Sequence, residues 1–303
     1  MILLTGATGN IGSKVLRRLS EAGVETRALS RAPRRGGALP HVEWVEADLA
    51  DPETLPPAFD GVDRLFLLTG NVQSMAQLQK NAVDEAVAAG VGHVVKLSAR
   101  GAQPESKSAI ARWHHEVEVH LKASGLSWTM LRPHVFMQNL LDQAERVRTK
   151  GTIRTAAGDG RIPFIDTRDI ADVATTVLTE PVEEHASETH LLTGGVALDY
   201  DQVAATLGAA TDRDVTYMAE SFDEARARLR NEGLPDWLIG SRLALAEYQR
   251  AGGKTARVTR DVFEVTGHPP RSLAQFAYDN QEAFTLSSEN VPSRRDAMAS
   301  SGV

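Results

Sequence analysis

Three glycines at regular spacing follow the first apolar run of the chain, in the motif TGATGNIG at residues 5–12. In such a motif the first glycine permits a tight turn after a strand, the second lets the backbone approach a pyrophosphate, and the third lets the next helix pack closely. The helix N-terminus would then offer free N–H groups to the phosphates. An apolar strand before the motif and an amphipathic helix after it favour a nucleotide site over a purely structural turn. We therefore predict a dinucleotide site formed by Gly6, Thr8, Gly9, Asn10, Ile11 and Gly12.

The end of the second expected strand carries a hydroxyl and a cation where an NAD site usually carries a carboxylate. Ser30 and Arg31 stand there, and Arg34 and Arg35 follow. Arg31 could pair with a ribose 2′-phosphate and stack on adenine, and Ser30 could donate a hydrogen bond to the same phosphate. The alternative is a solvated basic loop. Because the acid is missing and the base is present, we predict NADP(H) as the cofactor.

Two further strand ends are expected to contact the cofactor. Asp48 follows the third expected strand, where its carboxylate could accept from the adenine amino group or cap the turn before Pro52. The end of the fourth expected strand should lie along the nucleotide. These positions add Asp48, Leu49, Leu68 and Thr69 to the predicted cofactor site.

Placing these strand ends side by side requires a parallel sheet. Short apolar runs alternate with amphipathic segments, which indicates βαβ units with right-handed crossovers. The fold class is therefore α/β, a Rossmann-type doubly wound parallel sheet with a small, mainly helical C-terminal substrate lobe. Strands are expected at 2–4, 24–29, 42–47, 65–68, 94–97, 128–131 and 190–193, and helices around 11–19, 78–89, 116–123 and 169–178.

The domain organisation follows from the same pattern. We expect a Rossmann domain over 1–198, with its sheet completed at about 190–193, and a small substrate-facing lobe over 199–286 that contains a short strand at 215–217. Residues 287–303 are polar with almost no apolar side chains, so we expect a disordered tail.

The composition excludes several other classes of protein. No cysteine is present, and the nine histidines lack ligand spacing, so no metal site is expected. The net charge is -7 and the basic residues are scattered, so no nucleic-acid partner is expected. No stretch approaches the roughly 20 apolar residues of a membrane span. Since the chain opens on an apolar strand, we expect no signal peptide and a cytoplasmic location. The expected partner is a small molecule, and homo-oligomerisation is left open.

Four motifs give the chain a resemblance to a known family. They are TGATGNIG (5–12), VVKLSARGA (94–102), SGLSWTMLRPHVFMQN (124–139) and PFIDTRDIADVA (163–174). Together they resemble the NmrA-like branch of the atypical short-chain dehydrogenases/reductases over nearly the whole chain. That branch includes NAD(P)H-dependent quinone and azo reductases, isoflavone-type reductases, and nucleotide-sensing regulators without enzymatic activity.

The resemblance also suggests catalytic positions. Active members of the wider superfamily often use a Ser or Thr after the fifth strand, together with a Tyr-x-x-x-Lys pair on the next helix, and Ser98 fits the first role. Glu118 resembles a glutamate commonly found four residues beyond that Lys, which puts His114 at the Lys position and Ile110 at the Tyr position. Isoleucine cannot donate a proton, so the usual acid is missing. His114 could hold the ribose or donate a proton.

The missing acid bears on the reaction. Hydride transfer to a simple ketone needs a proton delivered to the developing alkoxide, whereas a quinone develops a delocalised phenolate that needs less help. We therefore predict NADPH-dependent reduction of a quinone or a related conjugated small molecule that is aromatic or quinone-like. The alternatives are a non-catalytic NADP(H)-sensing regulator and a redox-neutral epimerase or dehydratase on the same scaffold.

The segment after the sixth strand is expected to form the substrate wall. Pro133 breaks the strand and turns the chain over the nicotinamide, so His134 and Phe136 should face the pocket. Pro133 and Phe136 are predicted to contact the cofactor, and His134, Phe136 and Asn139 to contact the substrate. Trp237 could also line the substrate pocket or simply pack the lobe. Asp166 and Asp169 are expected to cap the helix that begins there.

Overall fold

A seven-stranded parallel sheet forms the centre of the computed structural model, which describes residues 1–32 and 39–285. The strand order is β3-β2-β1-β4-β5-β6-β8, and every neighbouring pair is parallel. This confirms the α/β fold class. The expected tail and the arginines at 34 and 35 lie outside the described residues. The strands are β1 Ile2–Leu4, β2 Thr26–Ser30, β3 Val42–Glu46, β4 Arg64–Leu67, β5 His93–Leu97, β6 Ser127–Pro133 and β8 Glu188–Leu192.

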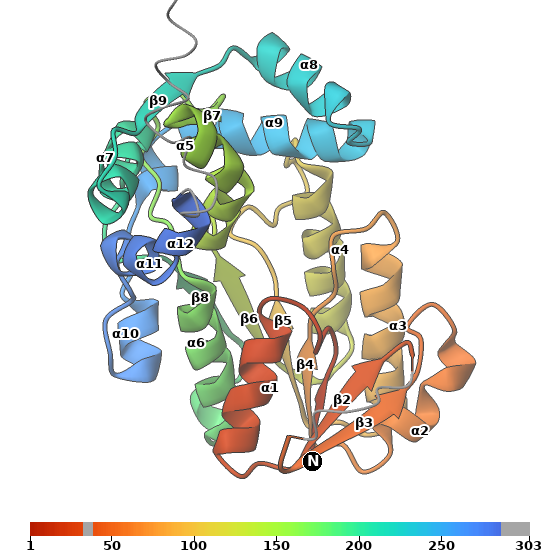
Figure 1. The fold of residues 1–303 in the computed structure, drawn as a ribbon. Helices are drawn as coiled ribbons and strands as arrows, with labels where there is room; N and C mark the ends of the chain where they lie inside the picture. Colours follow the sequence, from red (N-terminus) through yellow and green to blue (C-terminus); the bar gives the residue numbers. More distant parts are fainter. Residues whose placement is uncertain (33–38, 286–303) are drawn as a thin grey trace, which may run out of the picture.

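Helices cover both faces of this sheet (Figure 1). One face packs against α1 (Gly12–Glu21) and α6 (Thr167–Thr179), and the other against α3 (Met75–Ala88) and α4 (Ala109–Ala123). The strands are apolar on both faces because each face is buried under a helical layer. Short helical segments precede β4 and β8, namely η1 Pro52–Thr54, α2 Pro56–Phe59 and η3 Val182–Glu184.

The strand order reverses at β1, which pairs with β2 on one side and with β4 on the other. In doubly wound sheets, ligands bind outside the carboxyl ends of the strands at such a reversal. The glycine motif follows β1 directly, so the fold places it at this crevice.

A smaller lobe lies over the carboxyl edge of the sheet (Figure 1). Its strands, β7 and β9, form a separate parallel pair. Its apolar core joins Val147 and Ile153 to Leu207, Phe276 and Phe284, so a segment before residue 198 packs with the lobe. Its elements are η2 Met137–Gln143, α5 Ala144–Lys150, β7 Thr152–Thr155, α7 Tyr200–Thr211, β9 Thr216–Ala219, α8 Phe222–Asn231, α9 Asp236–Arg250, η4 Gly253–Ala256, α11 Leu273–Asp279 and α12 Gln281–Phe284. Helix α10 (Asp261–Thr266) returns to the sheet domain, where it packs against α6 and β8 and buries Val262.

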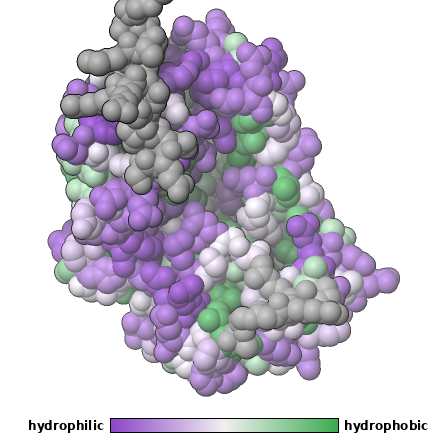
Figure 2. All heavy atoms as spheres, viewed as in Figure 1, coloured by the Kyte–Doolittle hydropathy of each residue, from purple (hydrophilic) through white to green (hydrophobic). Residues whose placement is uncertain are grey.

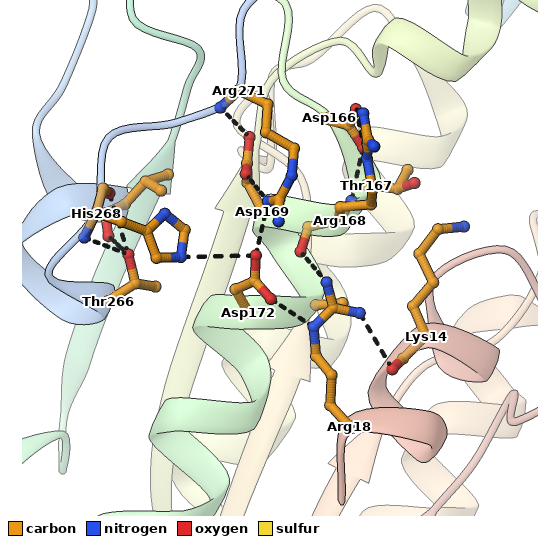
Figure 3. A network of polar contacts seen from close by, with 12 residues as sticks. Lys14, Arg18, Asp166, Thr167, Arg168, Asp169, Asp172, Thr266, His268 and Arg271 are labelled. Atoms are coloured by element: carbon orange, nitrogen blue, oxygen red, sulfur yellow. Dashed lines mark hydrogen bonds and ion pairs between the residues drawn. The ribbon is translucent and has the colours of Figure 1, made fainter. Parts of the chain in front are cut away.

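A network of ion pairs ties the lobe to the sheet domain (Figure 3). Asp172 of α6 forms an ion pair with Arg18 of α1. It forms a second ion pair with Arg271, from the segment before α11, with 2.7 Å between Arg271 Nη1 and Asp172 Oδ2. Arg271 also pairs with the buried Asp169 and donates its backbone N–H to that carboxylate at 2.9 Å. Asp166 caps α6 as expected, accepting from the Arg168 N–H, whereas Asp169 serves this interdomain contact rather than a cap.

Candidate active site

A cavity of about 1400 Å³ lies between the carboxyl edge of the sheet and the lobe. Figure 2 shows the surface hollowed between these two parts of the molecule, with apolar residues exposed at the walls. Its lining begins at the glycine motif, continues past the ends of β4, β5 and β6 and the start of α4, and extends into the lobe. The cavity therefore joins the expected cofactor and substrate regions.

The glycine turn has the geometry that a phosphate site requires. Gly6 has a φ of +61°, and a Cβ there would lie 2.8 Å from the Leu68 carbonyl oxygen. In front of Gly9 the space is open, since the nearest atom to a Cβ would be the Gly6 oxygen at 3.4 Å. At Gly12 a Cβ would lie 2.1 Å from that same oxygen, so Gly12 allows α1 to begin against the turn. All the predicted residues of this motif line the cavity except Gly12, namely Gly6, Thr8, Gly9, Asn10 and Ile11.

The N-terminus of α1 is left open toward a ligand. Ile11 stands at its N-cap and supplies no side-chain hydrogen bond. Ser13 and Lys14 already donate their backbone N–H groups to the carbonyl oxygens of Gly9 and Ile11. Within the described residues, the N–H groups of Asn10, Ile11 and Gly12 have no hydrogen-bond partner, so they remain available to an anion.

The residues predicted for the adenosine end also line the cavity, which includes Ser30, Arg31, Asp48 and Leu49. Asp48 accepts the Ala50 N–H at 2.9 Å, which is the turn-capping alternative considered for this residue. The Ser30 hydroxyl donates to the Ala32 carbonyl at 2.9 Å. Arg31 is exposed and makes no hydrogen bond or ion pair within residues 1–32 and 39–285, so its guanidinium is available to a phosphate.

The residues predicted for the nicotinamide end form the next part of the wall. His134 is buried with both ring nitrogens engaged: Nε2 lies 2.9 Å from the Thr255 carbonyl, and Nδ1 accepts the Val135 N–H at 2.8 Å. Burial and the nearby Arg100 lower the pKa of His134 to about 4. His134 is therefore a neutral wall residue at physiological pH. The predicted residues lining this end are Leu68, Thr69, Pro133, His134, Phe136 and Asn139.

Helix α4 brings the suggested catalytic positions to the cavity. Ile110 and His114 both line it, one helical turn apart. One turn further on, Glu118 is buried beneath them. The position that the resemblance assigns to a proton-donating tyrosine is thus an apolar part of the wall.

Ser98, at the end of β5, donates its hydroxyl proton to Glu118 Oε1 at 2.5 Å. The same carboxylate accepts hydrogen bonds from two nitrogens of Arg132 of β6, and the Arg132 Nε–Glu118 Oε1 distance is 2.9 Å. Burial raises the pKa of Glu118, but the hydrogen bonds from Arg132 and Ser98 outweigh this and hold it below its usual range. Ser98 lines the cavity, so its oxygen can still accept a hydrogen bond there.

Lys96 is a buried residue that the sequence analysis did not single out. Its Nζ lies 3.0 Å from His114 Nδ1 and 3.1 Å from the Leu97 carbonyl oxygen, in the layer between β5 and α4. Burial lowers its pKa to about 7, with Glu118 acting against the shift and Arg132 adding to it. The available signal was a lysine inside the apolar run VVKL, since a fully buried lysine is rare.

His114 is neutral in this setting. Burial, with the neighbouring Lys96 as a second cause, lowers its pKa well below the usual value. Since Nδ1 faces Lys96, Nε2 is the ring nitrogen left for the cavity that His114 lines.

Trp237 lies outside this wall, which corrects its predicted role as a substrate contact. Its ring packs against Trp113 of α4 with centroids 5.3 Å apart, and it is not among the lining residues. Helix α9 turns Trp237 toward α4 and presents Tyr248 to the cavity instead, with the Tyr248 ring 6.3 Å from the His134 ring. Trp237 thus has a packing role, as the structural alternative held, but it packs the lobe against α4 of the sheet domain.

Two other features lie apart from the cavity. Within the described ranges, Glu180, Glu184 and His185 have side chains close enough to share a metal ion, and none of them lines the cavity. No helix in the same ranges is both long and apolar enough to cross a bilayer.

Comparison with protein-family models matches residues 6–181 to the NAD(P)H-binding family. The matched segment begins at the glycine turn and ends after α6, so it covers the site just described. The chain belongs to this NAD(P)H-binding family.

Similarity to individual proteins extends over nearly the whole chain. The NAD(P)H azoreductase of Xenophilus azovorans is 38% identical over 289 residues, which cover 94% of this chain and 99% of that protein. The crystal structure of an NADPH-dependent quinone oxidoreductase from Escherichia coli, complexed with NADPH, superposes with a TM-score of 0.84 at 30% identity, covering 92% and 99% of the two chains. NmrA, a negative transcriptional regulator, shares the fold at a TM-score of 0.77 and 18% identity, covering 94% and 98%. The resemblance to the NmrA-like branch is thereby confirmed.

Proposed function

We propose that the protein is an NADPH-dependent reductase that transfers hydride to a quinone or a related conjugated small molecule. The observation that carries this proposal is the apolar side chain of Ile110 in the cavity wall, at the position that the resemblance assigns to a proton donor. An acceptor that delocalises the incoming charge suits such a wall better than an unactivated ketone does.

The size of the cavity supports a second ligand beside the nucleotide. A drug-sized ligand occupies a pocket of roughly 300–1000 Å³, and the present cavity is about 1400 Å³. Its wall includes the aromatic side chains of Phe136, Tyr200 and Tyr248. Aromatic side chains of this kind can stack on a flat conjugated substrate.

The guanidinium of Arg31, which is unpaired within residues 1–32 and 39–285, supports NADPH over NADH. Arg31 lines the cavity at the end of β2, where a site selective for NAD carries an acid. A charge-assisted contact with the 2′-phosphate would be available to NADPH alone.

The named relatives support a reductase over a cofactor-sensing regulator and over a redox-neutral epimerase or dehydratase. The azoreductase and the quinone oxidoreductase both align over nearly their whole length. The similarity to the regulator NmrA extends to the fold alone. A cofactor sensor and a redox-neutral tailoring enzyme are therefore less favoured.

The test is to follow the loss of NADPH absorbance with a panel of quinones, azo compounds and conjugated carbonyls, using unactivated ketones as the comparison set. We expect turnover with at least one quinone or azo compound and little with the ketones. If NADPH binds tightly but no acceptor oxidises it, the proposal fails, and a non-catalytic regulator that senses NADP(H) becomes the better interpretation.

A further inference from the structure

We propose that Lys96 is the proton reservoir of the reaction and passes its proton to the acceptor through the imidazole of His114. This inference rests on the proposed function, because it assigns the source of the proton that the reduced acceptor takes up.

The geometry places the two side chains in series between the protein interior and the cavity. Lys96 is completely buried, and among the described residues its Nζ is hydrogen-bonded to the Leu97 carbonyl and to His114 Nδ1. His114 lines the cavity on the other side. Protons can therefore reach Lys96 by way of the His114 ring.

Lys96 is not held as half of a structural ion pair. The nearby carboxylate, Glu118, is occupied by the Ser98 hydroxyl and by two nitrogens of Arg132. Burying an ammonium group without a hydrogen-bonded carboxylate is costly, and a Met would fill the same space without that cost. A perturbed ionisable group next to a cavity is a candidate for a functional role.

The ionisable groups facing Lys96 come from two neighbouring elements. Helix α4 contributes His114 and Glu118, and β6 contributes Arg132. Burial together with Arg132 outweighs Glu118, so the pKa of Lys96 falls to about 7. An acid is most effective when its pKa lies near the working pH, so Lys96 is suited to give up and regain a proton in each cycle.

The transfer proceeds as two linked steps. The Lys96 ammonium donates a hydrogen bond to His114 Nδ1, which keeps the imidazole proton on Nε2, facing the cavity. Hydride from NADPH converts a quinone to the hydroquinone monoanion. The anionic oxygen takes the Nε2 proton while Nδ1 takes a proton from Lys96, which leaves NADP⁺, hydroquinone, neutral His114 and a neutral amine. After product release, water in the cavity returns a proton by the reverse path.

Neither residue can perform this step alone. Loss of the Nε2 proton from an isolated neutral His114 would leave an imidazolate, which is strongly disfavoured, and Lys96 does not reach the cavity. The coupled transfer avoids both problems. Lys96 loses its positive charge as the negative charge of the acceptor is neutralised, so no imidazolate forms and Lys96 need not reach the acceptor itself.

Two variants separate the relay from a structural role. Lys96→Met keeps the unbranched side chain and removes the ammonium. His114→Gln keeps an N–H donor directed at the cavity but cannot carry a proton from one ring nitrogen to the other. Tyr248→Phe is the comparison variant, because Tyr248 lines the same cavity as His114 and the substitution removes its hydroxyl, an alternative source of the proton, while keeping the ring. Circular dichroism and the NADPH dissociation constant check the fold of each variant.

The first measurement does not depend on turnover. Nitrogen NMR of isotope-labelled histidine should place the His114 proton on Nε2 in the unmodified protein with NADP⁺ bound. In Lys96→Met the proton should redistribute toward Nδ1, and the pKa of His114 should rise because a neighbouring positive charge is lost. An unchanged tautomer and an unchanged pKa in Lys96→Met would overturn the relay.

The second measurement is the pH profile of kcat for a quinone or azo acceptor. The kcat of the unmodified protein should fall as pH rises through about 7. Lys96→Met should abolish this decrease in kcat at alkaline pH and lower kcat by roughly 10²-fold, in the range of lost general-acid catalysis. Tyr248→Phe should keep the decrease. If the decrease is lost in Tyr248→Phe and retained in Lys96→Met, Tyr248 is the source of the proton. If no acceptor is reduced, the proposed function fails, and the NMR result still decides whether Lys96 sets the His114 tautomer.

Discussion

The Ser98 hydroxyl lies 2.5 Å from Glu118 Oε1 and donates its proton to that carboxylate. The contact crosses from the end of β5 to α4 and orients the Ser98 oxygen at the edge of the cavity. Because an ionised carboxylate holds the Ser98 proton, we expect Ser98 to position the acceptor and not to donate a proton to it.

Replacing Ser98 with alanine should therefore have a moderate effect. We expect kcat with a quinone to fall by roughly 10-fold, less than the ~10²–10⁴-fold loss that follows removal of a general acid. Steady-state kinetics with the best acceptor measures this. Ser98→Thr, which keeps the hydroxyl, is the control and should retain most of the activity. A loss as large as that of Lys96→Met would mean that Ser98 itself delivers the proton.

Arg31→Ala should remove the preference for NADPH over NADH. The lost charge-assisted contact should weaken NADPH binding by about 1–3 kcal/mol and leave NADH binding nearly unchanged. Calorimetric titration with both cofactors measures the two dissociation constants, and Arg31→Lys tests whether charge alone suffices. Equal affinities in the unmodified protein would contradict the assignment.

Two glycines of the same turn should respond differently to substitution. Gly9→Val places a branched side chain in the open space where the pyrophosphate must approach, so cofactor binding should collapse while the fold survives. Gly12→Ala is the contrasting variant, since its Cβ would lie 2.1 Å from the Gly6 oxygen and must displace the backbone. It should lower the melting temperature. A folded Gly9→Val protein that titrates normally with NADPH would exclude a phosphate at this turn.

The sequence predicts this turn well because its chemistry is local. Gly6, Gly9 and Gly12 lie within seven residues, and the strand before them and the helix after them fix their setting. The ends of β2 and β4 are similarly predictable, because parallel strands must bring them to one edge. Residues such as Arg31 and Thr69 consequently line the cavity as expected.

Contacts between distant elements are less accessible to such reasoning. Lys96 and His114 are 18 positions apart and meet only because α4 packs on the face of β5 that carries Lys96. The short strand β7 was missed because Thr152–Thr155 contains a single apolar residue, Ile153, and pairs with β9, far along the chain. The direction of Trp237 depends likewise on how α9 packs against α4.

Acid should destabilise the fold through buried histidines. The pKa of His134 in the folded protein is about 4 because burial disfavours its charged form, while its usual value is 6.5. The unfolded chain therefore binds more protons between these two values, so the free energy of unfolding falls as pH drops through this window, by up to ~1.4 kcal/mol per pH unit from this residue. His93, buried with a pKa also of about 4, should contribute in the same direction. Urea unfolding at several pH values measures the slope. His134→Gln should be less stable near neutral pH, since it loses contacts to Thr255 and Val135, yet its stability should depend less steeply on pH. An identical slope in His134→Gln would mean that His134 is protonated in the folded protein.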